Sequence, residues 1–383
     1  MRRPQVRRAV SLVAAALLIV LAVGPVGASS PPALPVGAIT TSGIGASFPY
    51  PAYTSWFSKY KNTVSEASND NFQYVPNGSG AGVSNAQSSN PTSTWSASDL
   101  PMTNSEITTM NSNNSFGPPI HVPTLLGAVV LGIKLNCTSS TITLTRANVG
   151  DMFSGAITMW NDARLRDNGR NAGLASCNVK VGVVRRADSS GTTANFTAFL
   201  HSCTTTYWSS HLSGPTKTYN WPVGIAAQRN GGVAQKVKQL NGRIGYMEYA
   251  YAKQASLKIA RVQNGDGNNF VTASTSSVQA AAASTLSAQL SAHPDMRFDP
   301  VACAAGFNSY PITAYSYAML FTNAPGNQSQ AQVQELVAFF YWGLTTGQGY
   351  LSALGYAALP SAVATASINQ LHQVKWGGNA VWP

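Results

Sequence analysis

The chain has 383 residues and a formal net charge of +11, from 24 Lys and Arg against 13 Asp and Glu. This length is sufficient for two domains, and an excess of positive charge can attract anions. Only 10% of the residues are charged, and no basic run is interleaved with aromatic residues, so we expect no nucleic-acid partner.

The first 28 residues have the pattern of a secretory signal peptide. A start with four Arg precedes an apolar run over residues 9–23, and small residues follow at 24–29. The alternative is a membrane anchor, but the run is shorter than the ~20 residues that a spanning helix needs. Removal of residues 1–28 takes away four Arg and no acid, which lowers the charge to +7. No Cys lies near the cleavage site, so we expect a soluble, exported protein without a lipid anchor, in the periplasm or the medium.

All four cysteines lie in the part that is expected to be exported: Cys137, Cys177, Cys203 and Cys303. An even number of Cys outside the cell favours two disulfides. Three pairings are possible. We favour Cys137–Cys177 with Cys203–Cys303, although the sequence alone does not fix the choice. The spacing contains no CxxC motif and no partnering His cluster, so no metal site is expected.

A strand, a Gly/Ser-rich loop and a helix recur along the chain. Residues 29–37 are rich in Pro and small residues and predict a flexible leader. A strand at 38–40 then precedes a loop at 42–47, and a strand at 72–75 precedes a loop at 77–82 and a helix that begins near Val83. Strands that alternate with helices predict an α/β fold with largely parallel strands.

The third unit of this kind carries the most specific chemistry. An apolar strand over 179–184 precedes RRADSSGTT at 185–193, and a helical pattern follows. The first N–H groups of a helix are unpaired and lie at the positive end of its dipole. Gly191 lets an anion approach that backbone, and Arg186 can bind an oxyanion through two parallel N–H groups. These residues therefore predict an anion site.

The remaining segments complete the α/β pattern. Residues 122–133 predict a strand that crosses between domains, and 242–249 a further strand and turn. Residues 278–290 and 331–344 predict helices, the second with an apolar stripe that we assign to the core. Because ligands of open α/β sheets bind beyond the carboxyl ends of the strands, the three loops are candidates for a single site.

Several motifs, taken in order, resemble signatures of the phosphate-binding proteins that serve bacterial phosphate ABC transporters. They are GIGASFP at 43–49, NGSGAG at 77–82, ASDLPM at 97–102, DMFSG and ITMWND at 151–155 and 157–162, GYMEY at 245–249, YPI at 310–312 and GYAALP at 355–360. Each motif is modest by itself, but their order and spacing are specific, and they extend along nearly the whole chain after the signal peptide.

The resemblance implies a fold, a domain division and a function. The fold would be a two-domain periplasmic-binding-protein fold, type II-like, with α/β domains and the ligand in the cleft between them. Domain I would comprise residues 38–124 plus 308–383, and domain II residues 125–307. The protein would be an extracytoplasmic receptor that delivers inorganic phosphate to the permease and ATPase complex of an ABC importer. We expect a monomer that is not an enzyme and has no cofactor.

The family's phosphate-contacting positions carry over residue by residue. They fall on Ser47 and Phe48 through their backbone N–H groups, and on Ser79, Asp99, Arg186, Ser190, Gly191 and Thr192, while Asp188 matches the acidic residue that orients the Arg. Ser189 replaces the Gly that is common in the third loop, and Ser47 stands where Thr is frequent.

Asp99 is the residue that we expect to discriminate between anions. A carboxylate in an anion site is unfavourable unless the ligand carries a proton, as hydrogen phosphate and dihydrogen phosphate do. Sulfate at neutral pH carries none, so two acceptors would face each other. The sequence therefore predicts a preference for phosphate over sulfate.

Two other functions compete with this interpretation. A secreted adhesin or matrix protein could reuse the fold, and so could a phosphatase-like protein. The sequence has no Gly-x-Ser-x-Gly elbow and no metal-ligand cluster, and its five His are scattered. Binding is therefore favoured over catalysis.

Overall fold

The structure, a computed structural model, describes residues 30–35 and 37–382. The predicted signal peptide at 1–28 lies outside the described residues. Contacts divide the chain into Met1–Pro31 and Pro32–Pro383, and the description below concerns the second unit. The described residues of the predicted leader 29–37 contain no helix or strand.

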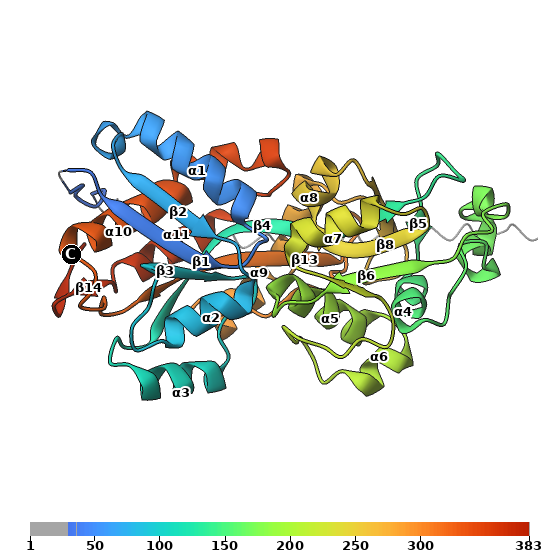
Figure 1. Ribbon diagram of the computed structural model, residues 1–383, viewed down its shortest axis with the longest axis horizontal. Helices are drawn as coiled ribbons and strands as arrows, with labels where there is room; N and C mark the ends of the chain where they lie inside the picture. The colour runs from blue at the N-terminus through green and yellow to red at the C-terminus, as the bar shows by residue number, and fades with distance from the viewer. Residues whose placement is uncertain (1–29, 36, 383) are drawn as a thin grey trace, which may run out of the picture. The chain divides into compact units, whose positions relative to one another are not determined.

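The main sheet has the strand order β2-β1-β3-β13-β4-β8-β6-β7 (Figure 1). The strands are β1 (Thr40–Gly45), β2 (Asn71–Val75), β3 (Trp95–Ser98), β4 (Pro119–Lys134), β6 (Gly182–Arg186), β7 (Ile225–Ala227), β8 (Arg243–Glu248) and β13 (Ile312–Phe321). Two short strands join it, β9 (Lys258–Ile259) on β4 and β12 (Val301–Ala302) on β13. Small sheets form from β5 (Thr143–Leu144), β10 (Arg261–Gln263) and β11 (Phe270–Val271), and from β14 (Lys375–Trp376) and β15 (Asn379–Ala380).

The sheet is mixed, so the prediction of largely parallel strands is only partly correct. The pairs β1–β2, β1–β3, β6–β7 and β6–β8 are parallel. The pairs β3–β13, β13–β4 and β4–β8 are antiparallel. The predicted βα units thus form two parallel groups, and β13 and β4 join these groups through the middle of the sheet (Figure 1).

Strand β4 belongs to both parts of the sheet. It pairs with β13 from Pro119 to Ala128 and with β8 from Val129 to Lys134. All its residues except the two at its ends are buried, as are all ten residues of β13. Strands covered on both faces are apolar along their whole length, which is why residues 122–133 could be predicted as a strand.

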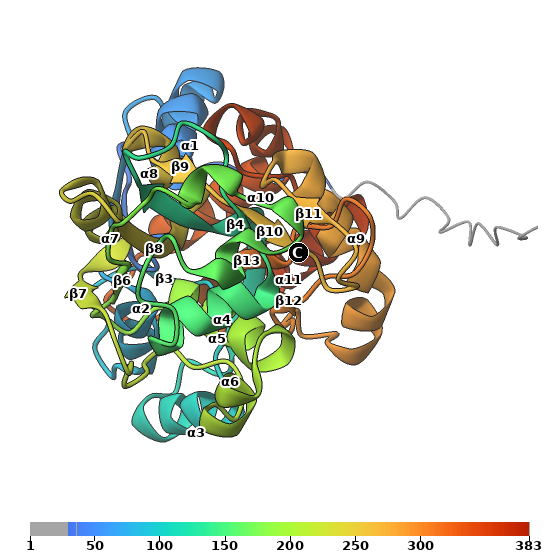
Figure 2. The same ribbon diagram turned by 90° about the vertical axis from the view of Figure 1, so that its right-hand side faces the viewer.

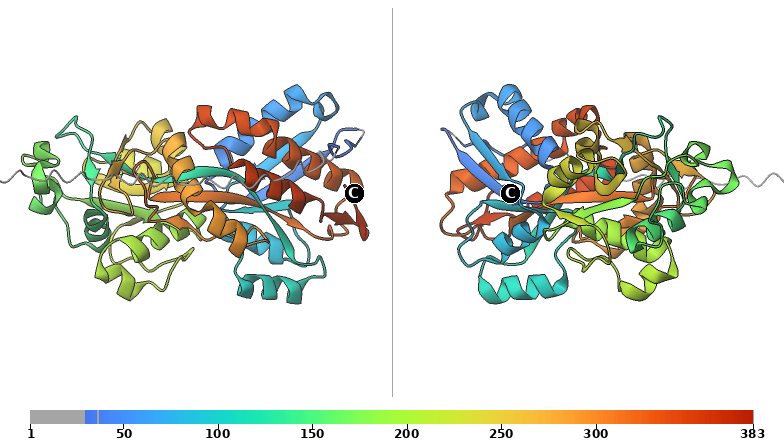
Figure 3. Two further views of the ribbon diagram at one scale, coloured as in Figure 1. Left: turned by 180° about the vertical axis from the view of Figure 1, so that it is seen from behind. Right: turned by 45° about the vertical axis from the view of Figure 1, so that its right-hand side comes forward.

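Helices cover both faces of the sheet, as the end-on and rear views show (Figures 2 and 3). They are α1 (Tyr50–Thr63), α2 (Ser79–Gln87), α3 (Asn104–Asn113), α4 (Arg146–Ser154), α5 (Gly191–Cys203), α6 (Thr206–His211), α7 (Arg229–Lys238), α8 (Tyr249–Gln254), α9 (Thr275–Ala292), α10 (Gln330–Leu344) and α11 (Ser361–Leu371). Short 3-10 turns lie at Ser65–Ala67, Ala163–Gly169, Ala172–Leu174, Thr346–Tyr350 and Ser352–Leu354. The two helices predicted at 278–290 and 331–344 are α9 and α10, and the apolar stripe of α10 is buried as expected except at Tyr341, which is half-buried.

The predicted boundaries of the strand–loop–helix units differ from those in the structure. Strand β1 continues to Gly45 because it pairs with β2 and β3, so the predicted loop starts too early. Strand β6 similarly continues to Arg186. Helix α2 begins at Ser79 and not near Val83, because its N-cap Gly78 adopts a φ of +97° that turns the chain into the helix. The serine of the second loop therefore occupies the first turn of a helix.

The cysteines pair as Cys137–Cys177 and Cys203–Cys303, the pairing that we favoured from the sequence. Within the described residues, no group of His, Cys, Asp and Glu is arranged to hold a metal ion. No helix formed by those residues is long and apolar enough to cross a membrane.

Candidate anion-binding site

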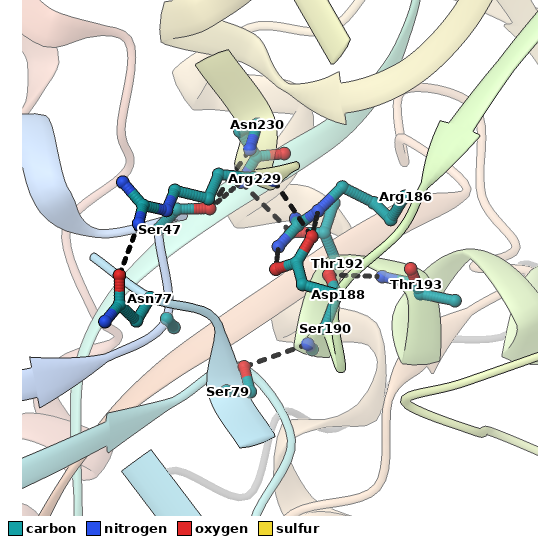
Figure 4. A network of polar contacts seen from close by, with 12 residues as sticks. Ser47, Asn77, Ser79, Arg186, Asp188, Ser190, Thr192, Thr193, Arg229 and Asn230 are labelled. Carbon is teal, nitrogen blue, oxygen red and sulfur yellow. Dashed lines mark hydrogen bonds and ion pairs between the residues drawn. The ribbon is translucent and has the colours of Figure 1, made fainter. Parts of the chain in front are cut away.

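The predicted ligand residues follow the carboxyl ends of four strands. Ser47 and Phe48 follow β1, Ser79 opens α2 after β2, Asp99 follows β3, and the remainder lie at the end of β6 and the start of α5. Figure 4 shows that side chains from the junctions after β1, β2 and β6, among them Ser47, Ser79 and Arg186, point toward one another. The structure thus brings the predicted polar residues into one network, with Phe48 next to it, at the edge of the sheet where α/β proteins bind ligands.

The N-termini of α2 and α5 meet at this network. The Oγ of Ser79 accepts the backbone N–H of Gly191 at 2.9 Å and that of Asp99 at 3.3 Å. The N–H of Gly80 donates to the carbonyl of Ser189 at 3.1 Å. Two positive helix ends therefore lie close together, an arrangement that favours negative charge between them.

Arg186 supplies a fixed positive charge. Its Nε donates to Oδ1 of Asp188 at 2.8 Å, its Nη2 forms an ion pair with Oδ2, and its Nη1 donates to Oγ1 of Thr192 at 3.3 Å. The N–H of Arg229 also donates to Asp188. Burial raises the pKa of Asp188, but the hydrogen bonds and charge of Arg186 outweigh burial and leave that pKa below its usual value. Asp188 is thus a carboxylate that holds Arg186 in place.

Asp99 is a buried carboxyl that is hydrogen-bonded through both its side chain and its backbone. Its side chain accepts the hydroxyl of Ser316 at Oδ1, 2.8 Å away, and its backbone carbonyl accepts Nδ2 of Asn195 at 2.7 Å. Burial raises its pKa to about 7, although the hydrogen bond from Ser316 and the charge of Arg186 oppose the rise. The group therefore changes protonation near neutral pH.

Ser47 contacts a residue that the sequence did not predict. Its Oγ accepts both the backbone N–H and the Nδ2 of Asn230, each at 3.1 Å. The same Nδ2 donates to Oγ1 of Thr192 at 3.1 Å. Asn230 is fully buried at the start of α7, directly after Arg229, whose φ is +61°. The available signal was that β7 and α7 form a further strand-to-helix junction, but β7 is too short to stand out in the sequence.

Ser190 and Phe48 have structural contacts of their own. Ser190 is the N-cap of α5, and its Oγ accepts the N–H of Thr193 at 3.1 Å. The ring of Phe48 is buried, and its carbonyl accepts the hydroxyl of Tyr356 at 2.6 Å. Both residues therefore fix the backbone of their loops next to the network.

A pocket of about 320 Å³ adjoins the network. Ser47, Tyr50 and Pro76 line it from one parallel group of the sheet, and Arg229 and Tyr251 from the other. The hydroxyl of Tyr251 donates to the carbonyl of Ser47 at 2.5 Å. Residues from both parallel groups of the sheet thus border the same hollow.

Comparison with known proteins identifies the family and agrees with this fold. Residues 29–342 match the model of the PBP superfamily domain, which together with the mixed α/β fold defines the class of protein. The phosphate-binding protein PstS of Xylella fastidiosa is 32% identical over 323 residues, which cover 84% of this chain and 82% of that protein. PstS of Pasteurella multocida is 34% identical over 332 residues, which cover 86% and 89%. The chain therefore belongs to the PstS family of phosphate-binding proteins.

A solved structure shows the same fold at lower sequence identity. A high-affinity periplasmic phosphate-binding protein, bound with phosphate, has a TM-score of 0.65 and is 20% identical, over 88% of this chain and 98% of that one. The fold is thus the two-domain periplasmic-binding-protein fold that we expected. The alternative function, a secreted adhesin, matrix or phosphatase-like protein, is not favoured by these relatives.

Proposed function

We propose that this protein is an extracytoplasmic receptor for inorganic phosphate that delivers its ligand to an ABC importer. Membership of the PstS family supports the ligand class. The observation that carries the proposal is the convergence of a buried carboxyl, Asp99, with the N-termini of α2 and α5 and the guanidinium of Arg186. An anion that carries a proton can donate to the carboxyl and accept hydrogen bonds from the helix N-termini and the guanidinium.

The ligand's oxygens accept hydrogen bonds from backbone and side-chain donors. The proposed set comprises the N–H groups of Ser47 and Phe48, the hydroxyls of Ser47, Ser79, Ser190 and Thr192, and the guanidinium of Arg186. Gly191, whose N–H donates to Ser79, contributes by leaving room for the ligand at the start of α5. A buried dianion requires such donors, because each unpaired acceptor would lose its hydration without compensation. Hydrogen bonds to charged groups contribute roughly 1.5–3 kcal/mol each, so a set of this size can outweigh the desolvation of phosphate.

Asp99 accepts the proton of the bound phosphate. Its Oδ1 is occupied by Ser316, which leaves Oδ2 for the ligand's P–OH group. Sulfate brings no proton at neutral pH, so its oxygen faces an ionised carboxylate and is repelled. The pKa of about 7 means that Asp99 is largely ionised at pH 8, where this discrimination is strongest.

The two proposed domains, residues 38–124 plus 308–383 and residues 125–307, close around the ligand by a hinge motion. Contacts between the proposed domains support this. Ser79 forms a hydrogen bond with Gly191, and Ser47 forms one with Asn230. An ion pair of 2.7 Å joins Lys217 to Glu106. Strand β4 crosses the proposed boundary after residue 124, and β13 pairs with it, so these two strands would carry the hinge.

The setting of the protein follows from the same proposal. It is exported to the periplasm or the medium without a lipid anchor, as the sequence of residues 1–28 predicts. The two disulfides are in keeping with an oxidising compartment. As a monomer it presents phosphate to the permease and ATPase complex, and it performs no chemistry on its ligand.

Calorimetric titration with phosphate and sulfate at pH 8 tests the proposal. We expect one phosphate per chain and sulfate binding at least about 100-fold weaker, because juxtaposed acceptors cost several kcal/mol. Asp99→Asn is expected to reduce the difference between phosphate affinity and sulfate affinity. The matched control is Asp299→Asn, because the side chain of Asp299 is 79% exposed. A protein that binds neither anion, or binds both equally well, would contradict the proposed function.

A further inference from the structure

One buried amide joins two of the hydroxyls that the proposed function assigns to phosphate. The Nδ2 of Asn230 donates to Oγ of Ser47 and to Oγ1 of Thr192, each at 3.1 Å (Figure 4). These hydroxyls come from different parallel groups of the sheet, after β1 and in α5. Asn230 has no exposed surface, so water does not compete for these bonds.

The orientation of this amide is fixed by its other end. The Oδ1 of Asn230 accepts the backbone N–H of Glu248 at 3.1 Å. An N–H can only donate, so the oxygen must face Glu248, and the NH₂ group must face the two hydroxyls. Both amide protons are then used, one for Ser47 and one for Thr192.

The hydrogen-bond capacity of the hydroxyls determines what they can still do. A hydroxyl has one proton and two lone pairs. The Oγ of Ser47 accepts two donors from Asn230, its backbone N–H and its Nδ2. The Oγ1 of Thr192 accepts Nδ2 of Asn230 and Nη1 of Arg186. The lone pairs of both oxygens are thus occupied, and among the described residues neither hydroxyl donates to a protein acceptor.

The hydroxyl oxygen of Ser79 also has both lone pairs occupied, but by different donors. Its Oγ accepts the backbone N–H groups of Gly191 and Asp99. Its two lone pairs are therefore filled by backbone donors, which a side-chain substitution cannot remove. The hydroxyls of Ser47 and Thr192 depend instead on a side chain, and this makes the role of Asn230 accessible to experiment.

We infer that Asn230 is a positioning residue that compels Ser47 and Thr192 to donate their hydroxyl protons to the phosphate oxygens. The inference rests on the proposed function, since it concerns the same site. Phosphate oxygens without a proton are acceptors only, so a hydroxyl helps binding only when its proton points to the ligand. Without the amide, each hydroxyl can rotate and donate elsewhere, and binding has to restore the orientation.

A double-mutant cycle on phosphate affinity tests this role. The variants are Asn230→Ala, the pair Ser47→Ala with Thr192→Val, and all three changes together, titrated with inorganic phosphate. We expect Asn230→Ala to weaken binding about 30-fold and the pair about 100-fold, since each lost hydrogen bond to a charged group is worth about tenfold or more. The triple variant should bind nearly as well as the pair, because Asn230 then has no hydroxyl to orient.

Asn264 offers a matched control. It is also fully buried, its Nδ2 donates to the carbonyl of Gly306 at 2.7 Å, and its Oδ1 accepts the N–H of Asn269 at 3.1 Å. Asn264→Ala should lower the melting temperature but change phosphate affinity less than about twofold, a difference within about 0.5 kcal/mol. If the losses from Asn230→Ala and from the pair multiply in the triple variant, Asn230 has only a structural role and the inference is wrong.

A second variant keeps the test decisive if Asn230→Ala does not fold. Asn230→Asp retains the shape and the acceptor for the N–H of Glu248, and replaces the NH₂ donor by an acceptor. We expect Asn230→Asp to lower phosphate affinity at least about 100-fold at pH 8, and to lower it less when Ser47 and Thr192 lack their hydroxyls. A phosphate affinity within about threefold of wild type overturns the inference.

A wild type that does not bind phosphate overturns the proposed function and this inference with it. If the wild type binds phosphate, but Asn230→Ala and the Ser47/Thr192 pair lower its affinity independently of each other, only the inference is overturned.

Discussion

The Oγ of Ser79 accepts the backbone N–H of Gly191 at 2.9 Å, although 112 residues separate the two in the sequence. This bond joins the first turn of α2 to the first turn of α5. A Cβ added to Gly191 would lie 2.6 Å from Cβ of Asp99, 2.7 Å from its N and 2.7 Å from Oγ of Ser79. The absence of a side chain at Gly191 is therefore what lets the two helix ends and the carboxyl of Asp99 come together.

Gly191→Ala is expected to weaken phosphate binding about 10- to 100-fold, because the added methyl forces apart the loops that form the site at a cost of about 1–3 kcal/mol. Calorimetric titration of the variant with phosphate measures this loss. Gly326→Ala is the matched control, since a Cβ there would meet no atom within 4 Å. Unchanged affinity in Gly191→Ala would mean that phosphate does not bind between these helix ends.

Arg186→Lys should weaken phosphate binding on the order of 100-fold, although the charge is retained. Lys cannot donate to Asp188 through two parallel N–H groups and also reach Thr192, as Arg186 does. The control is Arg164→Lys, because Arg164 also donates twice to one carboxylate, that of Asp162, but is 44% exposed. Phosphate titration should find the control unchanged, and equal affinities for both variants would show that only the charge of Arg186 matters.

Asp99→Asn should stabilise the phosphate-free protein at pH 8. Burial raises the pKa of Asp99 from 3.8 to about 7, so the folded protein holds this proton more tightly than the unfolded chain does. Stability is therefore lost as pH rises between these values. A difference of one in pKa between the folded and unfolded states corresponds to about 1.4 kcal/mol, which predicts a gain on the order of a few kcal/mol for the variant at pH 8 and little gain at pH 4.

Thermal unfolding of wild type and Asp99→Asn at both pH values measures this difference. The exposed Asp299→Asn should match wild type throughout. If Asp99→Asn is no more stable than wild type at pH 8, the carboxyl does not carry an unfavourable charge in the folded protein, and its proposed role as proton acceptor loses its electrostatic basis.

Local sequence patterns were sufficient to locate several of the strand-to-helix junctions that converge in the structure. A short apolar strand followed by Gly and Ser marks a strand-to-helix junction, because glycine permits the turn and the helix begins with unpaired N–H groups. The loops that carry Ser79 and Gly191 could be located for this reason, whereas a ligand role for Ser79 was implied only by the family resemblance. The long buried strand β4 was recognisable because burial on both faces requires an uninterrupted apolar run.

Features that depend on long-range contacts could not be predicted from these patterns. Ser47 and Asn230 are 183 residues apart, and nothing near Asn230 indicates that its amide meets a serine from another loop. The antiparallel pairing of β13 with β4 likewise depends on how the two parallel groups are joined. The start of α2 was misplaced because the φ of Gly78 is set by tertiary contacts of its loop, including the bond from its N–H to the carbonyl of Gly45 at 2.8 Å.

The Cys203–Cys303 disulfide ties the end of α5 to the segment before β13, and its removal should destabilise the protein more than removal of Cys137–Cys177. The sequence separations are 100 and 40 residues. A longer closed loop restricts the unfolded chain more, which predicts losses of about 5 and about 4 kcal/mol. Urea unfolding of the two double Cys→Ser variants measures both losses, with chemically reduced wild type as the reference for removing both bonds. Equal stability of the Cys203→Ser/Cys303→Ser variant and wild type would show that this bond does not restrain the unfolded chain.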